Sequence, residues 1–174
     1  MRMCYDVIKE DELVQQTLEE IKKLIFSIPR KKLKDLHCCN LYQPEESCLG
    51  LYFIESPDGK MLYIGKATSR TICEPIGAHF DSRVDSILNS LPKKVFEKTN
   101  YSEEFSSEEL DNVIQGLWDW AIAVLFVKAD DVDKTKRLIS KAESLLIFDM
   151  QPLKDNCING TNRKYPISID VPIG

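Results

Sequence analysis

The chain lacks the apolar features that place a protein in or across a membrane. None of its 174 residues form an unbroken apolar run of membrane-spanning length, and residues 1–12 hold no apolar core of the kind that a signal peptide needs. We therefore expect a cytoplasmic protein with no membrane partner. The six cysteines form no CxxC pair and no disulfide spacing, so in that compartment we expect thiols.

The chain also lacks an excess of positive charge, with 23 Lys and Arg against 28 Asp and Glu. The formal net charge of −5 argues weakly against a general nucleic-acid binder, because phosphate contacts favour a basic surface. The basic residues are unevenly spread, however, since residues 22–34 hold six Lys or Arg side chains and no acid. This basic run is either a solvated helix face and loop or a surface that follows a phosphate backbone, and the sequence keeps both alternatives open.

A length of 174 residues suits one domain, or one domain with an added segment. The hydrophobic share of 43% is that of an ordinary globular protein. Apolar residues at helical spacing predict a helix over 9–28 that Pro29 ends. A similar pattern predicts a second helix over 75–91, with Pro75 at its first position, where the missing N–H has no helical partner.

Three further segments are predicted in the C-terminal half of the chain. The polar segment 93–111 predicts a loop with a short helix, and the apolar run at 121–127 predicts a buried strand. A long helix is predicted over 133–149, ending before Pro152.

The stretch GLYFIESPDGKMLYIGKA predicts a β-hairpin, because two aromatic and β-branched runs flank a Ser-Pro-Asp-Gly-Lys turn signal. An Asp-Gly turn pairs Tyr52 with Gly65, whereas a Pro-Asp turn pairs Tyr52 with Tyr63 directly. Side chains alternate between the two faces of a sheet, so either register puts both phenols on the same face. The two tyrosines are then either a stabilising cross-strand pair or part of a site.

Three neighbouring features favour a site. Lys66 follows the second glycine directly, and His79 lies in the first turns of the next predicted helix. Glu143 has apolar neighbours one turn away on both sides along its helix. A carboxylate in that position is costly unless it is paired, bound to a metal or at the edge of the apolar stripe. Mg²⁺ is often held by one or two such carboxylates.

With these residues in view, the chain resembles the GIY-YIG nuclease family over residues 49–157. Five pieces in order carry the resemblance: Gly50-Leu51-Tyr52, Tyr63-Ile64-Gly65 with Lys66, His79, Glu143 and Asn156.

The resemblance implies an α/β domain of the α+β type over 49–160, with a small central three-stranded antiparallel sheet flanked by helices. We expect a helical extension at 1–48 and a tail at 161–174. The implied activity is hydrolysis of DNA phosphodiester bonds with one Mg²⁺ or Mn²⁺ ion. In that scheme Glu143 binds the metal, and Asn156 holds the elements of the site together by hydrogen bonds.

The resemblance implies that a tyrosine activates the attacking water. Tyr52 or Tyr63 would position or deprotonate it, with help from His79. A phenol with a pKa near 10 is a poor base at neutral pH, so Lys66 or the metal would need to lower that pKa.

One position departs from the family. The helix arginine that contacts the scissile phosphate would fall on Pro75, and the substitutes are Arg70 in the preceding loop and Arg83 one turn after His79. Loss of such a contact commonly costs about 10²–10³ in rate. The alternatives to a weakened endonuclease are an inactive nucleic-acid-binding module on the same fold and an α/β domain with no nucleic-acid role. The oligomeric state stays open, with a homodimer among the alternatives.

Overall fold

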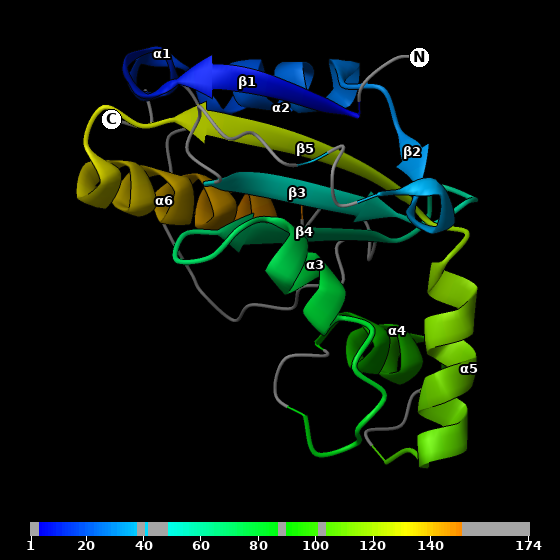
Figure 1. Cartoon of the computed structure of the whole chain (residues 1–174). Coiled ribbons are helices and arrows are strands. Elements are labelled where there is room, and N and C mark those ends of the chain that lie inside the picture. The colour runs from blue at the N-terminus through cyan, green and yellow to red at the C-terminus, as the bar shows by residue number, and fades with distance from the viewer. Residues whose placement is uncertain (1–3, 38–40, 42–48, 87–89, 101–103, 151–174) are drawn as a thin grey trace.

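The computed structural model of the chain describes residues 4–37, 41, 49–86, 90–100 and 104–150 (Figure 1). None of the helices in these ranges is long and apolar enough to cross a membrane. The elements within them are, in chain order, β1 (Tyr5–Lys9), α1 (Glu10–Gln15), α2 (Leu18–Ser27), β2 (Lys31–Lys32), a 3-10 turn (Leu33–Asp35), β3 (Gly50–Glu55), β4 (Leu62–Ala67), α3 (Cys73–Ala78), α4 (Ser90–Asn100), α5 (Ser107–Leu117), β5 (Ala121–Lys128) and α6 (Val132–Met150).

The described strands form one mixed sheet in the order β1-β5-β3-β4 (Figure 1). β3 pairs antiparallel with both β4 and β5, while β1 runs parallel to β5. β2 adds a two-residue antiparallel ladder at the start of β5. The predicted α+β class is consistent with this sheet, but the predicted small three-stranded antiparallel sheet is matched only in part, as the strands β5-β3-β4 of a larger one. Two strands from the N-terminal segment extend these three to a five-stranded mixed sheet.

Helices cover both faces of the sheet. α1, α2 and α6 contribute to the hydrophobic core on one face, and α3, α4 and α5 contribute to the core on the other (Figure 1). β5 lies between the two cores, and its residues from Ile122 to Val127 have no exposed surface. The buried strand predicted at 121–127 is confirmed, as is the long helix predicted over 133–149.

The single helix predicted over 9–28 is wrong, because the chain breaks it in two. α1 ends before Gln16, and Thr17 caps the start of α2. The Thr17 hydroxyl accepts the Glu20 N–H at 3.3 Å, and the Glu20 carboxylate accepts the Thr17 N–H at 2.8 Å. Such a capping box satisfies the first amides of a new helix. The apolar spacing continues across this break, so spacing alone does not reveal it.

The helix predicted over 75–91 also ends early. α3 ends just before His79, and α4 begins only at Ser90. Between them the Asp81 carboxylate accepts the backbone N–H of Arg83 at 3.1 Å and pairs with its guanidinium at 2.6 Å. Such local contacts compete with helical hydrogen bonds. Arg83 therefore does not share a helix face with His79, and that prediction is wrong.

The segment 93–111 contains more helix than predicted. Its first part belongs to α4 and its last part to α5. Ser106 and Glu109 form another capping box at the start of α5, with hydrogen bonds of 3.2 and 2.8 Å. The polar composition that suggested a loop is the solvent-facing side of two amphipathic helices.

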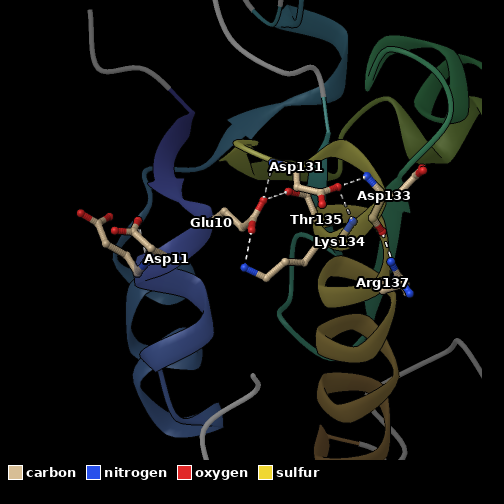
Figure 2. A network of polar contacts seen from close by, with 8 residues as sticks. Glu10, Asp11, Asp131, Asp133, Lys134, Thr135 and Arg137 are labelled. Atoms are coloured by element: carbon tan, nitrogen blue, oxygen red, sulfur yellow. Dashed lines mark hydrogen bonds and ion pairs between the residues drawn. The ribbon is translucent and has the colours of Figure 1, made fainter.

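A buried carboxylate ties the N-terminal segment to the start of α6 (Figure 2). Glu10 accepts the backbone N–H of Asp131 at 3.0 Å and the hydroxyl of Thr135 at 2.5 Å. It also pairs with the Lys134 ammonium at 2.6 Å. Lys134 is the largest of the influences that lower the pKa of Glu10 from 4.5 to about 2. The first helix is thereby attached to the helix that carries Glu143.

Candidate active site

β3 and β4 form the predicted hairpin. Tyr52 pairs with Gly65, which confirms the first of the two predicted registers. The Gly59 N–H donates to the carbonyl of Ser56 at 2.9 Å and closes the turn. Gly59 has a φ of 67°, a conformation that favours glycine. With a glycine opposite it, Tyr52 has room to lie across the neighbouring strand.

Packing explains the glycines of both tyrosine-bearing tripeptides. A Cβ atom at Gly65 would lie 2.6 Å from Cε2 of Tyr52 and closer still to two other atoms of that side chain. A Cβ atom at Gly50 would lie 3.1 Å from Cα of Phe126 on β5. Real Cβ contacts are rarely that short, so both positions require glycine. The two glycines are therefore explained by packing, which leaves the tyrosines and Lys66 as the hairpin residues that could take part in chemistry.

His79 joins the two tyrosines in a cluster that we call the Tyr–His–Tyr cluster (Tyr52, His79 and Tyr63). The two phenol rings lie on one face of the sheet, as predicted, with centroids 6.2 Å apart. The Nε2 atom of His79 lies 2.9 Å from the Tyr52 hydroxyl, and the His79 ring stands edge-on to Tyr63. The three residues are only 3%, 3% and 8% exposed in that order.

Ser90 is a contact of this cluster that sequence reasoning missed. Its hydroxyl lies 3.0 Å from the hydroxyl of Tyr63. Ser90 is the first residue of α4 and belongs to none of the five motif pieces. Only the packing of α4 against the sheet brings the two side chains together, so no sequence signal marks the contact.

Burial sets the protonation states in the Tyr–His–Tyr cluster. It lowers the pKa of His79 from 6.5 to about 4, so the imidazole is neutral at neutral pH. A neutral imidazole has one acceptor nitrogen, and Nε2 can therefore accept the Tyr52 O–H. Burial also raises the pKa of Tyr52 well above 10, and the Tyr63 phenol and the Glu143 carboxylate add to this. Tyr52 is a neutral phenol whose pKa is raised, not lowered as a tyrosine base would need.

Lys66 and Glu143 form an ion pair at the edge of the sheet. The Lys66 Nζ atom lies 2.7 Å from Oε2 of Glu143, and the two side chains are 33% and 16% exposed. The pair explains how a carboxylate is tolerated beside the apolar stripe of α6. Because side chains alternate along β4, Lys66 points toward the face that α6 covers, away from the face of Tyr63. The two groups of candidate residues thus flank the edge strand β4 on opposite faces.

A pocket of about 300 Å³ opens beside Lys66, and it is lined by the loop after β4 and by α3. Pro75 and Arg70 both contribute to its wall. Pro75 is the third residue of α3 instead of the first, but this first turn still tolerates a missing N–H. Arg70 is 64% exposed, with its Nε atom 3.9 Å from Glu74, so its charge is available to the pocket. Arg83 is not among the lining residues.

Glu143 is the residue through which a divalent ion would be held. The described residues contain no group of three or more His, Cys, Asp or Glu side chains that could hold a metal ion. Mg²⁺ keeps several of its waters and is often bound by one or two carboxylates together with substrate phosphates. The hard oxygen donors of Glu143 therefore fit one weakly bound Mg²⁺ or Mn²⁺ ion, in competition with the Lys66 ammonium.

The remaining predicted site residue, Asn156, lies outside the described residues. The chain matches no protein-family model, no curated protein and no solved structure. The resemblance to GIY-YIG nucleases accordingly depends on the residues themselves.

Proposed function

We propose that the chain is a metal-dependent DNA endonuclease of low intrinsic activity. The hydrogen bond of 2.9 Å between Tyr52 and His79 is the observation that supports this most. Through it the neutral imidazole of His79 can accept the Tyr52 proton while the phenol takes a proton from an attacking water. Tyr52 would then relay a proton to His79, whose pKa of about 4 makes the imidazole a weak acceptor, in keeping with low activity.

Charged residues that line the pocket, together with Glu143 on the neighbouring α6, supply the other roles. Glu143 would hold the divalent ion, which when bound stabilises the negative charge that develops on a phosphate. Lys66 and Arg70 would bind phosphate oxygens of the DNA strand. Pro75 offers neither charge nor donor, and the loss of one such contact commonly costs about 10²–10³ in rate. Slow cleavage is the expected result.

An inactive nucleic-acid-binding module is the second candidate. Tyr52 is 3% exposed and its pKa is raised well above 10, and both facts favour this alternative. A buried phenol is poorly accessible to water, and a neutral phenol is a weak base for an attacking water. Such a module would retain the fold and the phosphate contacts of Lys66 and Arg70 without cleaving DNA.

Nicking of supercoiled plasmid and of branched DNA separates the two candidates. The endonuclease predicts nicking with Mg²⁺ or Mn²⁺ that stops when a chelator is added. Salt-dependent DNA binding without nicking by either ion would favour the binding module, because phosphate contacts give binding a steep salt dependence. Absence of both nicking and binding would contradict both candidates.

A further inference from the structure

A stacked aromatic pair lies directly next to the Tyr–His–Tyr cluster. Phe80 follows His79, and its ring lies 4.1 Å from that of Trp118 with an angle of 18° between the two planes. Phe80 packs against the core on the α3 face of the sheet, whereas Trp118 follows the last residue of α5 and is 38% exposed. Trp118 is therefore the outer member of the stack.

The fold has room to bury a tryptophan in this segment, although Trp118 is exposed. Trp120, two residues further on, is 6% exposed and belongs to the core. Isolated exposed apolar side chains are common and need no explanation. Here, however, the backing by Phe80 holds a large flat ring in a fixed orientation at the surface. A flat, oriented aromatic ring is what a planar ligand stacks on.

Two lysines contact the end of α5 next to Trp118. The Trp118 carbonyl accepts the backbone N–H of Lys34 at 3.0 Å, which holds the basic segment against the end of α5. The ammonium groups of Lys32 and Lys34 lie 3.3 and 2.7 Å from the same oxygen of Asp119. Two positive charges share the Asp119 carboxylate, and the neighbouring Asp35 carboxylate also acts on Lys34. Both lysines are about half exposed, at 51% and 49%.

We propose that the Phe80–Trp118 stack, with the neighbouring Lys32 and Lys34, is a platform for an unpaired base of a nucleic acid. Base stacking on an aromatic ring is tolerant of sequence, and adjacent cations follow the phosphates of the same strand. Bases inside an intact duplex do not expose their faces, so the platform selects single-stranded or branched segments. The proposal rests on the proposed function, for which it gives the substrate class: nucleic acid with single-stranded or branched segments.

The lysines are what favour a nucleic acid over a protein on this surface. The centres of protein–protein interfaces are depleted in lysine, whereas surfaces that bind single strands combine aromatic rings with cations. The platform also begins one residue from His79, so a strand held there would pass close to the proposed cleavage site.

Binding measurements with two oligonucleotides test the platform. One is oligothymidylate, and the other is a chain of the same length and charge whose sugars carry no bases. At one salt concentration the parent protein should prefer oligothymidylate. Trp118→Ala should weaken that binding about 5- to 150-fold and leave the abasic chain unaffected. Trp118→Phe should retain most of the preference, while Lys32→Ala should weaken binding of both chains alike.

Equal binding of the two chains by the parent would overturn the platform, and so would unchanged oligothymidylate affinity in Trp118→Ala. A change in self-association of Trp118→Ala without a change in DNA affinity would also overturn it, in favour of a protein contact. If Trp118→Ala does not fold, a Trp120→Phe background leaves Trp118 as the only tryptophan of the chain. Its fluorescence should then be quenched by oligothymidylate and not by the abasic chain.

The platform and the proposed function fail in different ways. A protein that nicks plasmid but binds both oligonucleotides equally has the activity without the platform. A protein that prefers oligothymidylate but never nicks DNA has the platform without the activity.

Discussion

Replacement of His79 by glutamine tests the neutral imidazole at the centre of the candidate site. Burial lowers the pKa of His79 from 6.5 to about 4, so the unfolded chain takes up this proton at a higher pH than the folded chain does. Stability therefore rises with pH across this interval. The contribution of neutral His79 to the free energy of unfolding is present in full above pH 6.5 and is lost as the pH falls through about 4.

The difference between a pKa of 6.5 and one of about 4 sets the size of the effect. It corresponds to about 3 kcal/mol of unfolding free energy, which is lost in full only below the folded-state pKa. By about pH 5, roughly 2 kcal/mol of this should already be lost. Glu10 titrates below this range in the folded chain, with a pKa of about 2, and contributes little to it.

Urea unfolding between about pH 5 and pH 8 measures this loss. The parent should lose roughly 2 kcal/mol across the range, and His79→Gln should stay nearly level. NMR titration of the His79 ring, assigned with a His37→Gln variant, should give a midpoint near 4. Equal pH dependence in the parent and in His79→Gln, or a His79 midpoint near 6.5, would refute the burial argument.

Five further substitutions, two of them matched controls, test the packing and the pocket. Glu10→Gln should lower the free energy of unfolding by about 3 kcal/mol at neutral pH in urea unfolding, with a deficit that shrinks below pH 4.5, whereas Lys134→Met, which removes the exposed partner, should cost less. Gly65→Ala should cost about 1–3 kcal/mol in the same assay because its Cβ meets a tyrosine ring, while Gly116→Ala, with nothing within 4 Å, should gain about 0.5–1 kcal/mol. Pro75→Arg should speed plasmid nicking at least about tenfold, and an unchanged rate would argue that a missing arginine does not limit cleavage.

The parts of the fold that local pattern dictates could be predicted from the sequence. The Ser-Pro-Asp-Gly turn and the two runs that flank it predict the hairpin, and the period-2 alternation predicts that Tyr52 and Tyr63 share one face, as they do in the structure. The strand at 121–127 followed from an unbroken apolar run, because a central strand buried on both faces needs apolar residues at every position.

The parts that depend on a distant partner could not be predicted. β1 has a single buried residue, Ile8, and β2 consists of two lysines, so neither shows an apolar alternation. Both form because β5 offers them an open edge. The pairing of Lys66 with Glu143 likewise joins a strand to a helix more than seventy positions away.

Helix ends were the other source of error. Ile76, Phe80 and Val84 keep helical spacing past the end of α3. In the structure Phe80 stacks on Trp118, and the chain beyond it turns through local contacts of Asp81. Apolar spacing reports which residues are buried, and a turn can bury them as well as a helix does.

The most direct test of the proposed function compares Glu143→Gln with Glu108→Gln in plasmid nicking with Mg²⁺ and Mn²⁺. Both changes remove one negative charge with little change in volume, but Glu108 is exposed on α5 and does not line the pocket. We expect Glu143→Gln to lose at least about 100-fold in metal-dependent nicking while keeping the circular dichroism spectrum of the parent. Glu108→Gln should nick at the rate of the parent. Full metal-dependent nicking by a folded Glu143→Gln protein would contradict the proposed site.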